Sequence, residues 1–270
     1  MRSTRSLFLS LVFMGALAAC ADDATAPEPG ADEEVDATAD ALAFAEGLAL
    51  PGTNTDRETG AVPTGLTRLP CRYDAESGRW VCAPVTRDGL TFVRSFGYLD
   101  GDGNPMRRFD PLLTASANTR NAVHGTIERE NGSIRIRSAG EMTVSGLLGQ
   151  ETTHTLDGRE VGVREIELVS DQGTSSSRIE FANQTVAVVV PVLSSADRAA
   201  AARRWPLSGQ VVRAHAVTVT RGGETHNERW RETTTFNGTA LVPVEIVSSH
   251  GMRSCIRNLA TGELRCEGER

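Results

Sequence analysis

The chain has 270 residues, a formal net charge of −7 and a hydrophobic content of 39%, which allows a sizeable core and is close to the average of globular proteins. These values exclude wholesale disorder and a polytopic membrane protein, and an aromatic content of 5% argues against stacking platforms for single-stranded nucleic acid. All 28 cationic residues are arginines, which excludes lysine-dependent chemistry such as a P-loop or a Schiff base.

Residues 1–20 have the features of an export signal. A short basic start precedes an apolar run over 7–19, which is too short to cross a bilayer as a helix. The run ends in Leu17-Ala18-Ala19-Cys20. This ending resembles the lipobox of bacterial lipoproteins, in which an aliphatic residue and two small residues precede a cysteine. The resemblance implies a signal peptide over 1–19 and lipidation of Cys20, whereas the alternative is an ordinary secretory signal that ends in a cysteine by chance.

The composition changes after this signal. Eleven acidic residues and a single base, Arg57, lie between residues 21 and 60, without a sustained apolar pattern. Such a segment cannot offset its ordering entropy by burial, so residues 20–60 are predicted to form a lipid-anchored, acidic, flexible linker. Residues 61–270 are predicted to form a single disulfide-stapled β domain. With 24 acidic residues and 25 arginines this domain is about neutral, so it lacks the excess positive charge that is typical of a nucleic-acid-binding domain.

The residue after the lipidated cysteine bears on localisation. It is Ala21, whereas an aspartate at this position retains lipoproteins of diderm bacteria in the inner membrane. The resemblance therefore implies an exported protein that a lipid anchor holds at the cell envelope, at the outer membrane.

Four further cysteines lie in two segments of matching spacing. Ten residues separate Cys71 from Cys82 and also Cys255 from Cys266, and each interval contains an Asp or Asn before a turn that ends in Gly. A four-residue loop places the two cysteines of each segment opposite one another, where cross-strand Cβ atoms are about 4.5–5.5 Å apart. Of the three possible connectivities, this geometry favours disulfides 71–82 and 255–266. A metal site would require closer Cys or His spacing and is not expected.

Turn signals along the rest of the chain predict an antiparallel meander. Asp-Gly, Asn-Gly and Gly-Gly pairs separate extended runs. Within 133–145, apolar residues fall on one face and charged residues on the other, as in a sheet with one solvated side. Only one helix is predicted, near 194–204, where a capping box starts it and Pro206 follows it. The predicted fold class is all-β, an antiparallel meander rolled into an open barrel or a sandwich.

Two of the turn signals also predict local pairing. A turn at Asn131-Gly132 places Ile127 opposite Ile136, and Asp157-Gly158 predicts a second hairpin. After the Asp157-Gly158 turn, the alternation of apolar residues shifts by one position between 163 and 166. Such a slip predicts a β-bulge in this strand.

The Gly222-Gly223 turn brings the most polar candidate residues together. Two-residue pairing places His215 opposite Trp230, with Glu228 and His226 further along the same face. These four residues are the candidates for a polar site, either a pocket floor or a weak metal site. His215 and His226 lie four rows apart, too far to share one ion. The favoured alternative is a charged, solvated outer face that carries an Arg213–Glu232 ion pair.

Known catalytic motifs are missing from the sequence: it contains no GxSxG, HExxH, GxGxxG or CxxC. Asp100, Asp102 and Asn104 alternate as in the first half of an EF-hand loop. However, Pro105 replaces the required Gly, and the twelfth position is Pro111 rather than Glu. This segment is therefore predicted to be a solvated turn. No catalytic residue, metal or cofactor is expected.

These features favour a cell-envelope lipoprotein with a non-catalytic structural or binding β domain. The alternative is a periplasmic carrier of a hydrophobic ligand or lipid in an open β barrel, which rests on fold analogy and predicts a large apolar cavity. A third hypothesis is a hydrolase with a scattered constellation built from His124, His154 or His250. The expected partners are the membrane, through the lipid anchor, and a protein or lipid of unspecified identity, but not nucleic acid.

Overall fold

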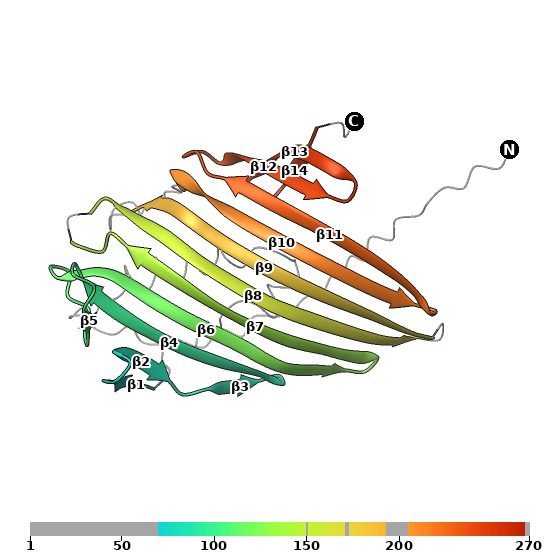
Figure 1. The fold of residues 1–270 in the computed structure, drawn as a ribbon, viewed down its shortest axis with the longest axis horizontal. Helices are drawn as coiled ribbons and strands as arrows, with labels where there is room; N and C mark the ends of the chain where they lie inside the picture. Colours follow the sequence, from blue (N-terminus) through green and yellow to red (C-terminus); the bar gives the residue numbers. More distant parts are fainter. Residues whose placement is uncertain (1–69, 150, 171–172, 193–204, 268–270) are drawn as a thin grey trace, which may run out of the picture.

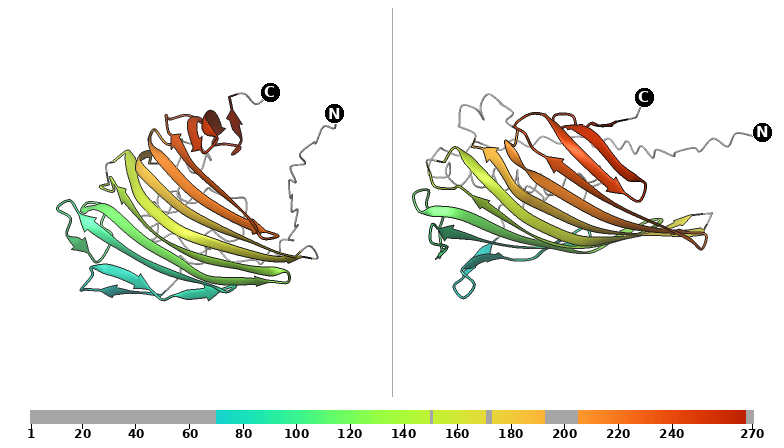
Figure 2. Two further views of the ribbon diagram at one scale, coloured as in Figure 1. Left: turned by 45° about the vertical axis from the view of Figure 1, so that its right-hand side comes forward. Right: turned by 45° about the horizontal axis from the view of Figure 1, so that its top comes forward.

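The described part of the chain is one large antiparallel sheet. The computed structural model describes residues 70–149, 151–170, 173–192 and 205–267. Its fourteen strands pair mainly with their neighbours in sequence and form a single twisted sheet (Figure 1). No pairing joins the first and last of the described strands, so the sheet is open (Figure 2). The predicted all-β antiparallel meander is therefore confirmed.

The strands near both edges are short and the central ones are long. In chain order they are β1 (Cys71–Asp74), β2 (Arg79–Cys82), β3 (Val85–Arg87), β4 (Leu90–Asp100), β5 (Pro105–Met106), β6 (Thr114–Arg129), β7 (Gly132–Ser145), β8 (Thr153–Ser170), β9 (Gly173–Pro191), β10 (Ser208–Arg221), β11 (Glu224–Thr235), β12 (Leu241–Ser248), β13 (Gly251–Asn258) and β14 (Leu264–Cys266). The order across the sheet follows this numbering, except that β2, β3 and β5 all pair with the same edge of β4, the edge that does not pair with β6.

Both edges of the sheet end in a disulfide-closed hairpin. Cys71 lies opposite Cys82 in β1–β2, and Cys255 lies opposite Cys266 in β13–β14, as predicted. Both pairs form disulfide bonds. Because an edge strand exposes unpaired backbone groups that can recruit another chain, short cross-linked hairpins are a suitable ending for so wide a sheet.

Side chains alternate between two faces of very different polarity. The inner face is the one that carries the buried residues Val144, Leu156 and Val188, none of which is exposed to solvent. The outer face carries rows of charged residues, for example Arg159, whose Nη2 lies 2.9 Å from Oε1 of Glu141. The predicted separation into an apolar face and a salt-bridged face is confirmed, and it explains why this sheet needs burial on one side only.

The predicted pairing at Asn131-Gly132 is wrong by two residues. Ile127 lies opposite Ile134 rather than Ile136, because the turn consists of Glu130 and Asn131 and Gly132 already belongs to β7. A Cβ atom on Gly132 would overlap the carbonyl oxygen of Glu167 on β8. This glycine is therefore required by a close approach between strands and not by the turn.

The Asp157-Gly158 pair does not form the predicted hairpin, because both residues lie inside β8. They mark a β-bulge instead: Leu156 pairs with Val188 and Gly158 with Thr185, so two residues of β9 face the single Asp157. The Asp157 carboxylate accepts a hydrogen bond from the backbone N–H of the bulged residue Ala187 at 2.8 Å. The register of β8 over 163–166 is regular, so the bulge predicted there is wrong.

Some predictions lie outside the described residues. They concern the signal peptide over 1–19, Cys20, the linker over 20–60 and the helix near 194–204. In the portion that is described, no helix is long and apolar enough to cross a membrane.

Candidate binding surfaces of the sheet

The β10–β11 hairpin has the predicted register throughout. His215 lies opposite Trp230, Val217 opposite Glu228 and Val219 opposite His226. The rings of His215 and Trp230 are stacked, with centroids 4.8 Å apart and an angle of 13° between their planes. The hairpin therefore places all four candidate residues on the inner face, as their alternation requires.

These four residues do not form a single site. His226 is exposed near the Gly222-Gly223 turn, whereas the His215–Trp230 pair lies in the middle of the strands. Among the described residues, no group of three His, Cys, Asp or Glu side chains is arranged to hold a metal ion. Across the sheet the stacked pair lies between Phe181, which is paired with His215 on β9, and Ser248, which is paired with Trp230 on β12.

The Arg213–Glu232 ion pair is present, but the predicted solvated outer face is wrong. Nη1 of Arg213 donates to Oε1 of Glu232 at 2.6 Å, and the two side chains are only 7% and 14% exposed. Residues two positions apart share a face, so the pair lies beside the buried Val211 and Thr234 on the inner face.

Arg257 of β13 completes this buried cluster. Its Nη1 and Nη2 donate to Oε1 and Oε2 of Glu232 at 2.8 and 2.9 Å, a bidentate arrangement. Burial of Glu232 acts to raise its pKa, but the hydrogen bond from Arg257 and the charges of Arg213 and Arg257 outweigh this effect and lower the pKa. We interpret the cluster as structural, because each carboxylate oxygen already accepts from a guanidinium.

The three histidines considered for a hydrolase are separated by the sheet. His154 lies on the inner face at the beginning of β8, where its Nδ1 is 2.8 Å from the carbonyl oxygen of Gly146. His124 is exposed on the outer face of β6, opposite Arg137. His250 lies in the turn between β12 and β13 and is also exposed. His154 and His124 thus point to opposite faces and cannot act on one substrate atom.

The predicted turn at residues 100–104 is present. The carboxylate of Asp100 accepts hydrogen bonds from the backbone N–H of Asp102 at 3.0 Å and from that of Asn104 at 2.8 Å. A hydrogen bond from the Asn104 side chain is the main cause of the lowered pKa of Asp100. This carboxylate closes its own turn, as an Asx turn does.

A shallow groove of about 730 Å³ crosses the outer face from β8 to β12. Its lining includes the small side chains Ala182, Ala214 and Ala216 and the valines Val161, Val163 and Val247. Phe181, His215 and Trp230, which alternate with these residues along the strands, also line it. We refer to it as the alanine groove. Val161 is 56% exposed and Val247 is 42% exposed, so this apolar surface faces solvent in the described part of the chain.

Two arginines of β11 border the alanine groove. Arg229 and Arg231 are exposed, lie opposite Ala216 and Ala214, and have no ion-pair partner among the described residues. Other charges on this face pair across strands, as in the Arg135–Glu165 pair at 3.5 Å and the Arg159–Glu141 pair at 2.9 Å. Glu180 also lines the groove, but its carboxylate pairs with Arg178 at 3.0 Å. The groove therefore combines small apolar side chains with the positive charge of Arg229 and Arg231.

The sequence did not predict this groove as such, but two of the four candidate polar-site residues, His215 and Trp230, are among the residues that line it. The apolar residues of β8 change face between Val163 and Ile166, and this change suggested a bulge. In the structure the pairing of β8 is regular between Val163 and Ile166, and the change occurs because Val161 and Val163 line the groove on the outer face. In β8, the change of face of the apolar residues thus marks an apolar surface that is not part of the core.

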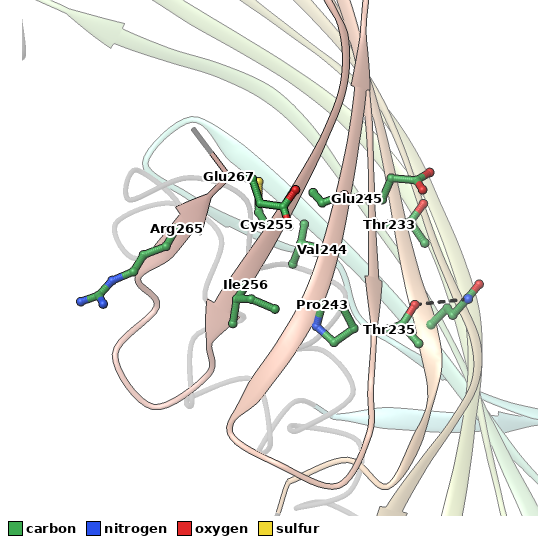
Figure 3. Close-up of a pocket in the computed structure, with 11 residues that line it drawn as sticks. Thr233, Thr235, Pro243, Val244, Glu245, Cys255, Ile256, Arg265 and Glu267 are labelled. Atoms are coloured by element: carbon green, nitrogen blue, oxygen red, sulfur yellow. Dashed lines mark hydrogen bonds between the residues drawn. The ribbon is translucent and has the colours of Figure 1, made fainter. Parts of the chain in front are cut away.

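A second groove of about 460 Å³ lies on the outer face towards the β14 edge (Figure 3). Pro243, Ile256 and two carboxylates, from Glu245 and Glu267, line it. The Arg265 side chain points away from the other lining residues in Figure 3 and pairs with Glu263 instead, at 2.8 Å. The outer face thus carries a negative groove beside the positive alanine groove, with β11 contributing to both.

No family model, curated protein or solved structure matches this chain.

Proposed function

We propose that this protein is a cell-envelope lipoprotein whose β domain is a non-catalytic binding module, and that the alanine groove is its binding surface. The observation that carries this proposal is an apolar surface, exposed at Val161, Ala182 and Val247, beside the uncommitted guanidinium groups of Arg229 and Arg231. A partner segment with apolar and acidic side chains supplies both complements, because carboxylates pair well with arginine forks and apolar side chains pack over small residues.

Photo-crosslinking in the cells that make the protein tests the groove. A benzoylphenylalanine at Ala182 should form a covalent adduct with the partner. The matched control is Ala139, which is also exposed on the outer face and lies in the same cross-strand row, but outside the groove. Changing Arg229 and Arg231 to Glu should abolish the adduct. Equal adducts from both alanines, or none from Ala182, would contradict the proposal.

Anchoring is tested separately. The lipobox over 17–20 supports acylation of Cys20, so mass analysis of the mature polypeptide should show a chain that begins at residue 20 and carries acyl groups. The Cys20→Ala chain should lack this added mass and leave the membrane fraction. An intact, unmodified N-terminus in the native protein would overturn this part of the proposal.

A carrier of a hydrophobic ligand is the second candidate. The volume of the alanine groove falls within the range of about 300–1,000 Å³ that is usual for ligand pockets. Ligand pockets, however, bury most of the ligand surface, and a shallow groove on the face of a sheet leaves an acyl chain largely in water. Native mass spectrometry decides between the two candidates: a bound lipid that Ala214→Trp displaces favours the carrier.

A further inference from the structure

Three leucines project from two adjoining loops at one end of the sheet. Leu112 is 78% exposed, Leu113 is 57% exposed and Leu148 is 39% exposed. The first two lie between β5 and β6, and the third lies between β7 and β8. Single exposed apolar residues are common, but a cluster on neighbouring loops usually marks a contact surface.

The loop that carries Leu112 and Leu113 has a defined conformation. The Asp110 carboxylate accepts a hydrogen bond from the N–H of Leu112 at 2.8 Å, and the Asp110 carbonyl accepts from the N–H of Leu113 at 3.1 Å and of Thr114 at 2.7 Å. Thr114 Oγ1 in turn accepts from the N–H of Asp110 at 2.9 Å. These hydrogen bonds fix the turn while both leucine side chains remain in solvent.

The second loop is joined directly to the first. The N–H of Gly149 donates to the carbonyl oxygen of Pro111 at 2.6 Å, which places Leu148 next to the leucine pair. The three residues Leu112, Leu113 and Leu148 therefore form one surface, which we call the leucine patch. The N–H groups of Leu112 and Leu113 and the C=O of Leu148 are hydrogen-bonded within the protein, which lowers the cost of moving the patch into an apolar phase.

The chain reaches the sheet beside this patch. The described residues begin at Pro70, immediately before β1, and the β1–β2 hairpin contacts the segment that leads into the patch. Trp80 Nε1 donates to the carbonyl oxygen of Arg107 at 2.8 Å, and the Arg107 guanidinium lies over the Tyr73 ring at 5.7 Å. Figure 1 shows β1, β2 and β5 together at this corner of the sheet. The connection to residue 20 therefore starts at the same corner as the leucine patch.

Charge is balanced around the patch, so the apolar side chains determine its preference. The exposed Arg107 and Arg108 precede the loop, whereas Asp110 lies in it and the exposed Glu151 follows Leu148, which gives two positive and two negative charges. This composition suits the interfacial region of a bilayer, where leucines enter the acyl boundary and arginines meet headgroup phosphates.

We propose that the leucine patch inserts into the surface of the membrane to which the chain is anchored and thereby orients the sheet on it. This inference rests on the proposed lipid anchoring of Cys20. Insertion of two or three leucines is too weak to hold a protein at a membrane without a second anchor. A lipid-anchored domain already lies close to the bilayer, so the effective concentration of lipid at the patch is high and the leucines need only orient the domain.

The test uses the full mature lipoprotein in vesicles of phosphatidylethanolamine and phosphatidylglycerol. Leu112→Cys is labelled with a polarity-sensitive nitrobenzoxadiazole dye. The control is Leu168→Cys, an exposed leucine (50%) at the opposite end of the long strands. We expect blue-shifted emission and at least a fivefold stronger quenching by nitroxide lipids at residue 112 than at residue 168. Leu113→Asp in the labelled chain should return the quenching to the control level.

The outcomes separate the two proposals. If the lipoprotein does not float with the vesicles, the anchoring proposal has failed. If it floats but the dye at residue 112 is quenched by aqueous iodide as strongly as the dye at residue 168, the membrane contact is refuted while the anchor stands. A blue shift without quenching by nitroxide lipids means that protein covers the patch, which also overturns the inference.

Discussion

Glu232 is the residue whose removal should most clearly test the buried ion cluster. Its carboxylate accepts from Arg213 Nη1 at 2.6 Å and from two guanidinium nitrogens of Arg257 at 2.8 and 2.9 Å. The side chains of Arg213 and Arg257 are 7% and 21% exposed. In Glu232→Gln, two guanidinium charges would lie close together without their carboxylate.

The expected cost follows from burial. Removing one partner of a buried ion pair costs about 3–5 kcal/mol, because the remaining charge stays desolvated. We expect the lower end, about 3 kcal/mol, since glutamine still accepts one hydrogen bond. For a domain of this size that loss corresponds to a fall of about 6–12 °C in Tm. Replacing the whole cluster by Arg213→Met, Glu232→Leu and Arg257→Met should recover most of this loss.

Urea unfolding of the disulfide-intact chain, followed by tryptophan fluorescence and circular dichroism, measures this change. The control is Glu263→Gln, since Glu263 and its partner Arg265 are 50% and 79% exposed, and the unfolding midpoint should not change. A loss below about 0.5 kcal/mol for Glu232→Gln, the size of an ordinary surface change, would refute the argument.

The same residue predicts a pH dependence. The pKa of Glu232 in the folded chain lies below its ordinary value of 4.5, because the arginines outweigh the effect of burial. A carboxyl group whose pKa is lower in the folded chain than in the unfolded chain stabilises the folded state. This stabilisation is complete above the unfolded-state pKa and is lost as pH falls through the folded-state pKa. The difference in unfolding free energy between wild type and Glu232→Gln should therefore shrink below about pH 4.5, and a difference that is constant down to pH 2 would contradict this.

Two further predictions concern packing and cross-links. A Cβ at Gly162 would overlap the Phe181 ring and lie 2.8 Å from a backbone oxygen, so Gly162→Ala should lower the unfolding free energy by about 1–3 kcal/mol. The control Gly101→Ala should not change it, because there is open space around Gly101. Equal effects of the two substitutions in thermal unfolding would disprove this packing. Replacing Cys255 and Cys266 by Ser removes a cross-link of sequence separation 11, which should lower the unfolding free energy by about 2–3 kcal/mol. It should also promote aggregation at the β14 edge, measured by light scattering. Unchanged stability would show that the cross-link is dispensable.

Local pairing could be derived from the sequence because hairpin register depends on residues close in the chain. The cysteine hairpins and the whole β10–β11 hairpin, including His215 opposite Trp230, were predicted correctly by counting from Gly and Asx turn residues. The count failed at Asn131-Gly132, because Gly132 responds to the approach of Glu167 from β8 and not to the turn. A glycine that serves a neighbouring strand cannot be distinguished by sequence from one that serves a turn.

The surfaces to which we assign function depend on contacts between strands that are far apart in sequence. Alternation identified Arg213 and Glu232 as a pair, but only the folded sheet brings Arg257 to them and buries all three beside the core. The alanine groove likewise requires five strands, from β8 to β12, to lie side by side, with small residues in two adjoining cross-strand rows. Sequence thus determined the two-faced meander, since alternation and turns are local, whereas burial and surface shape followed from the pairing and curvature of the whole sheet.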